Sequence, residues 1–414
     1  MGIWSSAMGS SPAGVRRRAF AAAAFLVAAA ALIGGCATAA AGPTHPQQAP
    51  APAAPAPAAV VPVLTLQPAA DAADVAPSGL AHASASAGTL KDVALTGADG
   101  KPVPGSYSAD TAQWTATAPL AYKGKYTWSG SMVAPDGTAT PLTGTFSTVT
   151  PKRTVKGSLN IGDGQTVGVA APIEVHFNRD LSAEAKAAVE RGLTVTTSVP
   201  VQGAWAWLPD DQVGSRVHWR PKDYWPANTQ VTVKAPLYGL DLGTAGWGTA
   251  DVGSSFTIGR SQIVKADEDS HRIQVVRDGQ QVMDLPASYG LETDPNRVTR
   301  SGTHIVMAKS EKVLMSNPDY GYENVPEYWA VRISNNGEFI HANPASNWAQ
   351  GKRNISHGCI NLSTANAKAY FDTAMFGDPV EVTGSSVKLS AADGDIYDWA
   401  ITWDDWTKMS ALTA

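Results

Sequence analysis

The sequence predicts a mainly β protein made of several domains. Its 414 residues exceed what one hydrophobic core usually organises. From about residue 86 onward, short runs of alternating apolar and polar residues are separated by Gly, Pro and Asp, which is typical of short strands joined by turns. We expect two small β-sandwiches over residues 86–150 and 151–258. A third β-module with one short helix follows over 259–384, and a Trp-rich extension over 385–414 ends the sequence.

The composition excludes several classes of protein. The chain has 31 basic and 36 acidic residues and a formal net charge of −5, so it lacks the positive excess typical of nucleic-acid binding. Two cysteines are too few for a disulfide scaffold. Beyond the N-terminal region, no run of about eighteen apolar residues could span a membrane.

Residues 1–35 have the features of an export signal. Three arginines, 16–18, precede the apolar stretch 19–33, which is short for a transmembrane helix. Small residues then precede Cys36, an order that resembles a bacterial lipobox, in which the cysteine is acylated. The resemblance implies a lipoprotein anchored to the outer face of the cytoplasmic membrane, in the cell-wall space. The alternative is cleavage nearby, with Cys36 incidental.

Residues 36–85 are expected to form a linker. Their Pro-Ala repeats favour extended polyproline II structure and offer little apolar surface for a core. The segment is then a semi-rigid stalk or, alternatively, a disordered tether. Either would hold the folded part away from the membrane.

The two predicted sandwiches look immunoglobulin-like. In the first, residues 110–117 and 124–128 alternate in polarity, and Pro135-Asp136-Gly137 is a turn signal. The second contains five tryptophans, enough for a core without disulfides: Trp205, Trp207, Trp219, Trp225 and Trp247. These aromatic residues could instead bind glycan, but buried packing is the interpretation that we favour.

Two turn signals organise the third module. Asp278-Gly279 and Asn336-Gly337 each lie between alternating runs, which predicts two-residue hairpins. The second hairpin would place His341 at the end of a strand, where its position is well fixed. Farther along, Ser363 is a suitable N-cap for an Ala-rich helix that reaches about residue 375.

A candidate thiol site lies between this hairpin and helix. Cys359 can act as a nucleophile near neutral pH only if a neighbour stabilises its thiolate, and His341 and His357 are the candidates. Gly358 would let the backbone approach a ligand closely. The amides of Gly358 and Cys359 could then donate to a developing oxyanion. These are the parts of a thiol acyl-transfer site.

The spacing of these residues resembles a known signature. His341, fourteen further residues and then Ser356-His-Gly-Cys-Ile-Asn361 are similar to the His…[Ser/Thr]-His-Gly-Cys-x-Asn signature of L,D-transpeptidases, the YkuD family. The resemblance extends from about residue 260 onward, and it implies a YkuD-type β-sandwich for the catalytic domain. The lipobox, stalk and two immunoglobulin-like modules resemble those of mycobacterial and related actinobacterial members. The Trp-rich tail resembles their C-terminal extension, which packs back on the catalytic domain.

The resemblance assigns the central catalytic roles. Cys359 would be the nucleophile that forms a thioester, and His341 would be its base. The backbone carbonyl of Ala342 would orient the His341 ring, and the amides of Gly358 and Cys359 would form the oxyanion hole.

The resemblance also assigns residues that surround these groups. Ser356, His357 and Asn361 would shape the pocket, and Tyr322 and Met315 match positions of a lid over it.

The implied reaction builds 3→3 cross-links in peptidoglycan. Such enzymes attack the bond between meso-diaminopimelate and the terminal D-Ala of a tetrapeptide stem, and D-Ala leaves. The acyl group then passes to the side-chain amine of diaminopimelate on a second stem. The partners are therefore peptidoglycan stem peptides, with no metal and no organic cofactor, and carbapenem-type β-lactams would acylate the thiol. The two sandwiches would act as spacers that set the depth of the catalytic domain in the wall.

Several alternative functions share parts of this pattern. An L,D-carboxypeptidase would resolve the same thioester with water, and a non-catalytic lipoprotein would bind the wall through its β-modules. A zinc site at His341, His357 and Cys359 lacks a fourth ligand. A sortase would need an arginine downstream of Cys359, where none occurs. Finally, the thiol could be buried and inert, although the combined motif speaks against this.

Overall fold

The computed structural model describes residues 61–391 and 396–413. The expected signal peptide, the lipidation of Cys36 and the expected linker up to residue 60 lie outside the described residues. Residues 60–414 form one compact unit. This unit contains all the sheets and hydrophobic cores of the described residues, so it carries within itself the packing that it needs to fold. No helix in the described ranges is long and apolar enough to cross a membrane.

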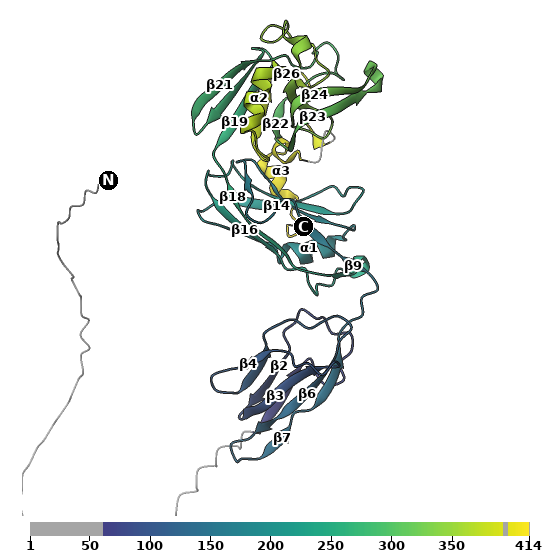
Figure 1. Ribbon diagram of the computed structural model, residues 1–414. Coiled ribbons are helices and arrows are strands. Elements are labelled where there is room, and N and C mark those ends of the chain that lie inside the picture. Colours follow the sequence, from purple (N-terminus) through teal and green to yellow (C-terminus); the bar gives the residue numbers. More distant parts are fainter. Residues whose placement is uncertain (1–60, 392–395, 414) are drawn as a thin grey trace, which may run out of the picture. The chain divides into compact units, whose positions relative to one another are not determined.

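The first domain is a β-sandwich of two four-stranded sheets (Figure 1). One sheet has the order β1 (Val63–Gln67), β2 (His82–Ser86), β5 (Gln113–Ala116) and β4 (Gly105–Tyr107). The other contains β3 (Thr89–Gly97), β6 (Lys125–Val133), β7 (Ala139–Pro141) and β8 (Gly144–Ser147). Trp114 and Trp128 meet edge to face in the core, with ring centroids 5.6 Å apart.

The first domain begins earlier than the sequence predicts. The expected boundary at residue 86 is wrong, because β1 and β2 are integral strands of the first sheet. The reason lies in side-chain size. In β2, the buried residues are the small Ala83 and Ala85, and Ala83 pairs with the large Trp114 on β5. An Ala/Ser strand opposite a tryptophan fills the core without the β-branched residues that usually indicate a strand.

The second domain is also a two-sheet sandwich. Its first sheet has the order β10 (Gly157–Leu159), β12 (Ile173–Phe177), β15 (Arg216–Pro221) and β14 (Gly203–Leu208). Its second has the order β11 (Thr166–Val167), β18 (Val252–Ile258), β16 (Gln230–Ala235) and β13 (Thr194–Thr197). The smaller elements are β9 (Thr154–Val155), β17 (Trp247–Gly248), α1 (Ala183–Glu190) and η1 (Gly243–Ala245). The buried tryptophans Trp207, Trp219 and Trp225 confirm the expected aromatic core.

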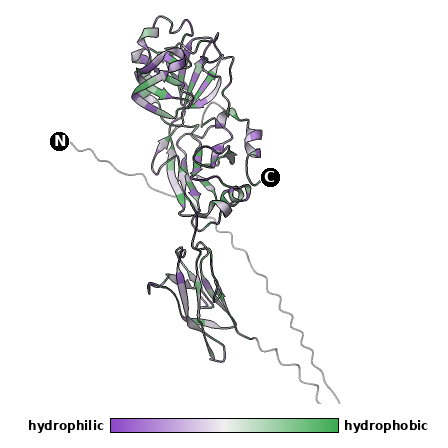
Figure 2. Cartoon of the chain, turned by 90° about the vertical axis from the view of Figure 1, so that its right-hand side faces the viewer, coloured by the Kyte–Doolittle hydropathy of each residue, from purple (hydrophilic) through white to green (hydrophobic). Residues whose placement is uncertain are grey.

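The third domain consists of two sheets around a shared core, with helix α2 against them. The first sheet has the order β21 (Gln280–Pro286), β20 (Arg272–Arg277), β19 (Gln262–Asp267), β27 (Pro379–Thr383) and β22 (Gly302–Ile305). The second has the order β23 (Ala308–Asn317), β24 (Tyr322–Arg332), β25 (Phe339–Ala342) and β26 (Ile360–Leu362). Helix α2 (Thr364–Thr373) begins at the predicted cap, because Ser363 Oγ accepts from the Asn366 amide. It packs against β24 and β25. Hydrophobic and hydrophilic residues are mixed along the strands (Figure 2), as expected for sheets with one buried face.

The two turn signals have different outcomes. Asp278 and Gly279 both have positive φ and join β20 to β21 directly, as predicted. The second hairpin is wrong in its length, because β24 ends at Arg332 and β25 begins only at Phe339. The intervening loop contains Gly337 at a φ of +101°, a conformation that favours glycine. His341 consequently lies inside β25, one residue before its end.

The C-terminal extension packs on both the catalytic and the second domain. Its first residues pair with Ser301 of the catalytic domain through Val387 and Leu389, and η5 (Asp398–Ala400) contacts β22, so the expectation of packing on the catalytic domain holds for this part and is wrong for the rest. Helix α3 (Trp403–Lys408) lies against β14, and its Trp406 indole N–H donates to the Ala204 carbonyl at 2.9 Å. The cause is Arg220 on β15, which presents a guanidinium to three tryptophan rings of the extension at 4.7–5.4 Å: Trp399, Trp403 and Trp406.

Candidate active site

Sheet pairing brings the segments of His341 and Cys359 together. Strands β25 and β26 are parallel neighbours, and His341 pairs in register with Asn361. Cys359 directly precedes β26 and therefore lies close to His341. The two residues are eighteen positions apart in the sequence, and the parallel pairing fixes their relative position more firmly than a loop contact would.

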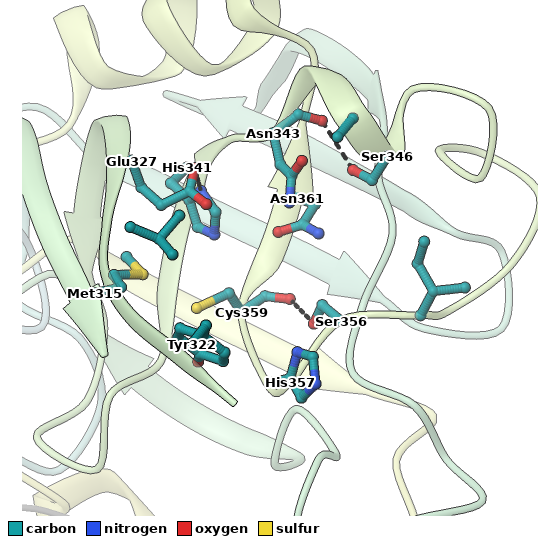
Figure 3. Close-up of a pocket in the computed structure, with 13 residues that line it drawn as sticks. Met315, Tyr322, Glu327, His341, Asn343, Ser346, Ser356, His357, Cys359 and Asn361 are labelled. Atoms are coloured by element: carbon teal, nitrogen blue, oxygen red, sulfur yellow. Dashed lines mark hydrogen bonds and ion pairs between the residues drawn. The ribbon is translucent and has the colours of Figure 1, made fainter. Parts of the chain in front are cut away.

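The Cys359 thiol is accessible and free. Its side chain is partly exposed, and it is the one free cysteine in the described part of the chain. The sulfur lies 3.6 Å from the Gly337 carbonyl oxygen. Figure 3 shows the sulfur directed into a cavity between His341 on one side and Tyr322 on the other. A nucleophile in this place can be reached by a substrate carbonyl.

His341 is almost fully buried and is held from two sides. Its Nδ1 lies 3.0 Å from the Ala342 carbonyl oxygen, as the resemblance implied, and 3.2 Å from Oε2 of Glu327. This arrangement leaves Nε2 for the thiol. Burial lowers the pKa of His341, but the hydrogen bonds to Cys359 and Glu327 raise it more, to about 10. At neutral pH the imidazole is therefore held in its charged form.

The turn before the nucleophile has a special backbone conformation. Gly358 has a φ of +111°, which side chains rarely tolerate. Ser356 Oγ accepts from the Gly358 amide at 3.1 Å and donates to the Cys359 carbonyl at 2.5 Å. Thr299 Oγ1 donates to the Gly358 carbonyl at 2.9 Å. The Gly358 amide and the carbonyls of Gly358 and Cys359 are thus each hydrogen-bonded to a neighbouring side chain, which holds the turn in place.

This hydrogen bonding modifies the expected oxyanion hole. The Gly358 amide is already used by Ser356 Oγ, so it can serve an oxyanion only if that bond opens. The Cys359 amide has no backbone or side-chain acceptor within the described residues. It is therefore the better placed of the two predicted donors.

Two cavities meet at the thiol. The first has a volume of about 330 Å³, and it is lined by all five residues predicted to shape the pocket and its lid: Met315, Tyr322, Ser356, His357 and Asn361. The second, of about 240 Å³, also borders Cys359 and extends to Arg332 and Gly337. Tyr322, Met315, His357 and Cys359 line both cavities, so the sulfur can be approached from two directions.

The hairpin β23–β24 forms the wall opposite the thiol. It carries Met315 and Tyr322, the two predicted lid residues. His357 packs against the rings of Tyr320 and Tyr322, with centroids 4.8 and 5.5 Å away. Burial and the nearby Arg297 lower the pKa of His357, so this ring is neutral and acts as a packing surface at neutral pH.

Three residues that support the site were missed from the sequence. Arg297 donates to the carbonyls of Ile355 (2.7 Å) and Ser356 (3.2 Å). Thr299 holds Gly358, as described above, and Glu327 contacts His341. None of them lies in a local motif, and no sequence signal indicates that they reach the thiol loop.

The zinc alternative finds no support in the arrangement of the donors. Among the described residues, no three or more His, Cys, Asp or Glu side chains converge as ligands for a metal ion. His341 contacts a backbone carbonyl and a carboxylate, and His357 faces tyrosine rings. Both imidazoles are thus engaged in ways that serve the thiol and the pocket.

Comparison with known proteins agrees with this geometry. The family of bacterial Ig domains matches residues 72–241, and the L,D-transpeptidase catalytic domain family (YkuD) matches residues 261–382. The chain belongs to the L,D-transpeptidases. It is 54% identical over 351 residues to L,D-transpeptidase 5 of Mycobacterium tuberculosis (strain ATCC 25618 / H37Rv), covering 85% of this chain and 77% of that protein. It is 34% identical to L,D-transpeptidase 2 of M. tuberculosis (strain CDC 1551 / Oshkosh), covering 84% of each.

The chain is also similar to solved structures of L,D-transpeptidases. The LD transpeptidase LdtMt1 in complex with imipenem is 32% identical and has a TM-score of 0.46, over 55% of this chain and 97% of that one. L,D-transpeptidase 3 from M. tuberculosis in complex with a faropenem-derived adduct is 28% identical with a TM-score of 0.44, over 55% and 97%. The predicted family, the mainly β fold class and the enzyme class are thus confirmed.

Proposed function

We propose that this transpeptidase forms 3→3 cross-links between meso-diaminopimelate residues of peptidoglycan stems through a thioester at Cys359. The observation that carries the proposal is the pairing of a buried, charged His341 with an accessible thiol where β25 and β26 lie side by side. A thiolate next to an imidazolium is a ready nucleophile with an acid at its side.

The acylation step uses each group of this pair. The Cys359 thiolate attacks the carbonyl carbon between diaminopimelate and D-Ala, and the Cys359 amide donates to the oxyanion. The C–N bond then breaks, the imidazolium of His341 gives its proton to the leaving amine, and free D-Ala departs. A thioester and a neutral His341 remain.

The second step reverses the roles. The side-chain amine of a second stem attacks the thioester carbonyl, and His341 accepts the proton that the amine loses. The C–S bond breaks and restores the thiolate–imidazolium pair. The product is an amide between two diaminopimelate residues, and no metal or organic cofactor takes part.

The test incubates residues 60–414 with a tetrapeptide stem that ends in meso-diaminopimelate–D-Ala. The masses of the peptide products are then measured by mass spectrometry. We expect a peptide dimer that has lost one D-Ala, and no dimer with Cys359→Ala. Shortened monomer alone would indicate the L,D-carboxypeptidase alternative. If the folded protein forms neither product, the result would favour the wall-binding alternative.

The same protein is proposed to be acylated by carbapenem-type β-lactams. Two related transpeptidases have been solved with imipenem and with a faropenem-derived adduct, and the open thiol here offers the same kind of nucleophile. Incubation with a carbapenem should add one inhibitor mass to the wild-type protein. The adduct should be absent in Cys359→Ala.

The N-terminal region is proposed to anchor the enzyme to the outer face of the cytoplasmic membrane through an acylated Cys36. The support is the order of the basic, apolar and small residues before this cysteine. Labelled palmitate should be incorporated into the wild-type chain in cells and not into Cys36→Ala. In this arrangement the β-domains are spacers, and a chain that lacks residues 37–258 should fail to cross-link the wall normally.

A further inference from the structure

Glu327 lies beside the catalytic base although it belongs to the lid hairpin. Along β24, its neighbours Pro326 and Tyr328 are exposed, whereas only 17% of the Glu327 side chain is accessible. Strand alternation therefore turns its carboxylate inward. Figure 3 shows it next to His341, on the side of the ring away from the sulfur of Cys359.

The Nδ1–H group of His341 thus faces two acceptors. The Ala342 carbonyl at 3.0 Å is enough by itself to fix the tautomer and the ring orientation. The Glu327 carboxylate at 3.2 Å adds a negative charge that a carbonyl does not have. An opposite charge at this distance stabilises the imidazolium over the neutral ring. The contribution of Glu327 is therefore to the charge of His341 more than to its orientation.

We propose that Glu327 is a positioning residue that keeps His341 as an imidazolium, so that Cys359 rests as a thiolate before any substrate arrives. The inference rests on the proposed thioester mechanism and deepens it. In the resting enzyme the thiol proton already lies on His341, between the thiolate and the carboxylate. After acylation, that proton leaves with the amine of D-Ala, and Glu327 then favours its recovery from the incoming amine.

Besides Glu327, the ionisable side chains that line the two cavities with His341 and Cys359 are Tyr322, His357 and Arg332. Tyr322 of the lid faces both charges, and its pKa is raised by burial and by the charges of Cys359 and Glu327. It therefore stays neutral through neutral pH. Arg297 acts on Tyr322 in the opposite direction and is held by the carbonyls of Ile355 and Ser356. Glu327 is thus the acidic group in direct contact with the base.

The first experiment measures the charge of His341 without its thiol partner. In residues 60–414 carrying Cys359→Ala, the His341 ring is titrated by NMR with and without Glu327→Gln. Glutamine keeps the size and an acceptor oxygen but removes the charge. We expect the substitution to lower the pKa of His341 by about 1 to 3. An unchanged titration would overturn the proposal, and this result does not depend on whether the enzyme cross-links stems.

The second experiment connects the charge to the reaction. The rate of carbapenem acylation is measured against pH for the wild type, Glu327→Gln and a control, Glu323→Gln, which changes an exposed acid on the same strand. Glu327→Gln should be slowed about tenfold at neutral pH, and its alkaline limb should move to lower pH. The control should match the wild type.

The pH profile separates charge from structure. If Glu327→Gln slows acylation but leaves the alkaline limb of its pH profile unmoved, the contact is merely structural and the proposal is overturned. An equal effect of Glu323→Gln would overturn it as well. Glu327→Asp, which restores the charge, should return the limb toward that of the wild type. Failure of the wild type itself to be acylated would count against the proposed function, while the NMR titration would still decide the role of Glu327.

Discussion

The buried His218 predicts that stability falls as the pH rises. This histidine on β15 is fully inaccessible, and its Nδ1 lies 2.9 Å from Asp398 of the C-terminal extension, which is also fully buried. Its Nε2 lies 3.4 Å from Glu174 on β12. Burial alone lowers the pKa of His218, but the two carboxylates raise it more, to about 9. The perturbation that tests this arrangement is Asp398→Asn, which keeps the shape and removes one charge.

The magnitude follows from the difference between the folded and unfolded states. A change of one in pKa corresponds to about 1.4 kcal/mol, so a rise from 6.5 to about 9 corresponds to about 3 kcal/mol. Because the folded pKa is the higher one, this stabilisation is complete below pH 6.5. It is lost progressively as the pH rises and is gone above about 9. Glu174 remains in Asp398→Asn, so the variant should lose only part of the pH dependence, about 1 to 3 kcal/mol.

The assay is urea unfolding of residues 60–414, followed by tryptophan fluorescence, at several pH values from about 6 to 10. At each pH, the free energy of unfolding of the variant is subtracted from that of the wild type. The subtraction cancels the contribution of His341, whose raised pKa also makes stability fall as the pH rises. The advantage of the wild type should shrink by about 1 to 3 kcal/mol over this range. Asp404→Asn, which changes an exposed acid of the same extension, is the matched control. A constant difference between wild type and Asp398→Asn would refute the reasoning.

Three further changes probe the thiol loop and the first domain. Gly358→Ala places a side chain at a φ of +111°, which costs about 1–3 kcal/mol of strain. Carbapenem acylation should therefore slow at least about tenfold, while circular dichroism shows an intact fold. An unchanged rate would contradict the strained turn. Arg297→Lys loses the two guanidinium hydrogen bonds to the Ile355 and Ser356 carbonyls, so acylation by a carbapenem should slow. Lys309→Arg, whose ammonium binds the Phe371 carbonyl instead of the loop, should leave the rate unchanged. A chain that starts at residue 86 lacks β1 and β2, and hydrogen exchange should show the first domain unfolded; full protection would mean that its sheet does not need these strands.

The sequence predicted the parts of the fold and site that depend on local patterns. Alternation and turn signals indicated the sandwiches, and the long Cys-containing motif located Cys359 and His341. The Ser363 cap was also predictable, because capping depends on neighbouring residues. In contrast, β2 escaped because its buried face is made of alanine, and only the opposing Trp114 explains why alanine fits there.

The parts that were missed depend on contacts between distant segments. Glu327 reaches His341 through the pairing of β24 with β25, which contains an irregularity in register that no local pattern indicates. The engagement of the Gly358 amide depends on the rotamer of Ser356. The docking of the extension on β14 and β15 depends on Arg220, a residue that resembles any surface arginine in the sequence.

The course of the chain through the second and third domains has a mechanical consequence. The chain enters the catalytic domain at Arg260 and, through Trp399 and α3, returns to the second domain that it left. Backbone hydrogen bonds between Gly168 and Phe376 and between Ala170 and Gly377 add direct contacts between the two bodies. A body attached by a single linker can swivel about it, but one attached at both of its ends resists torsion. A torque on the second domain would therefore be transmitted through these contacts to the domain that carries Cys359.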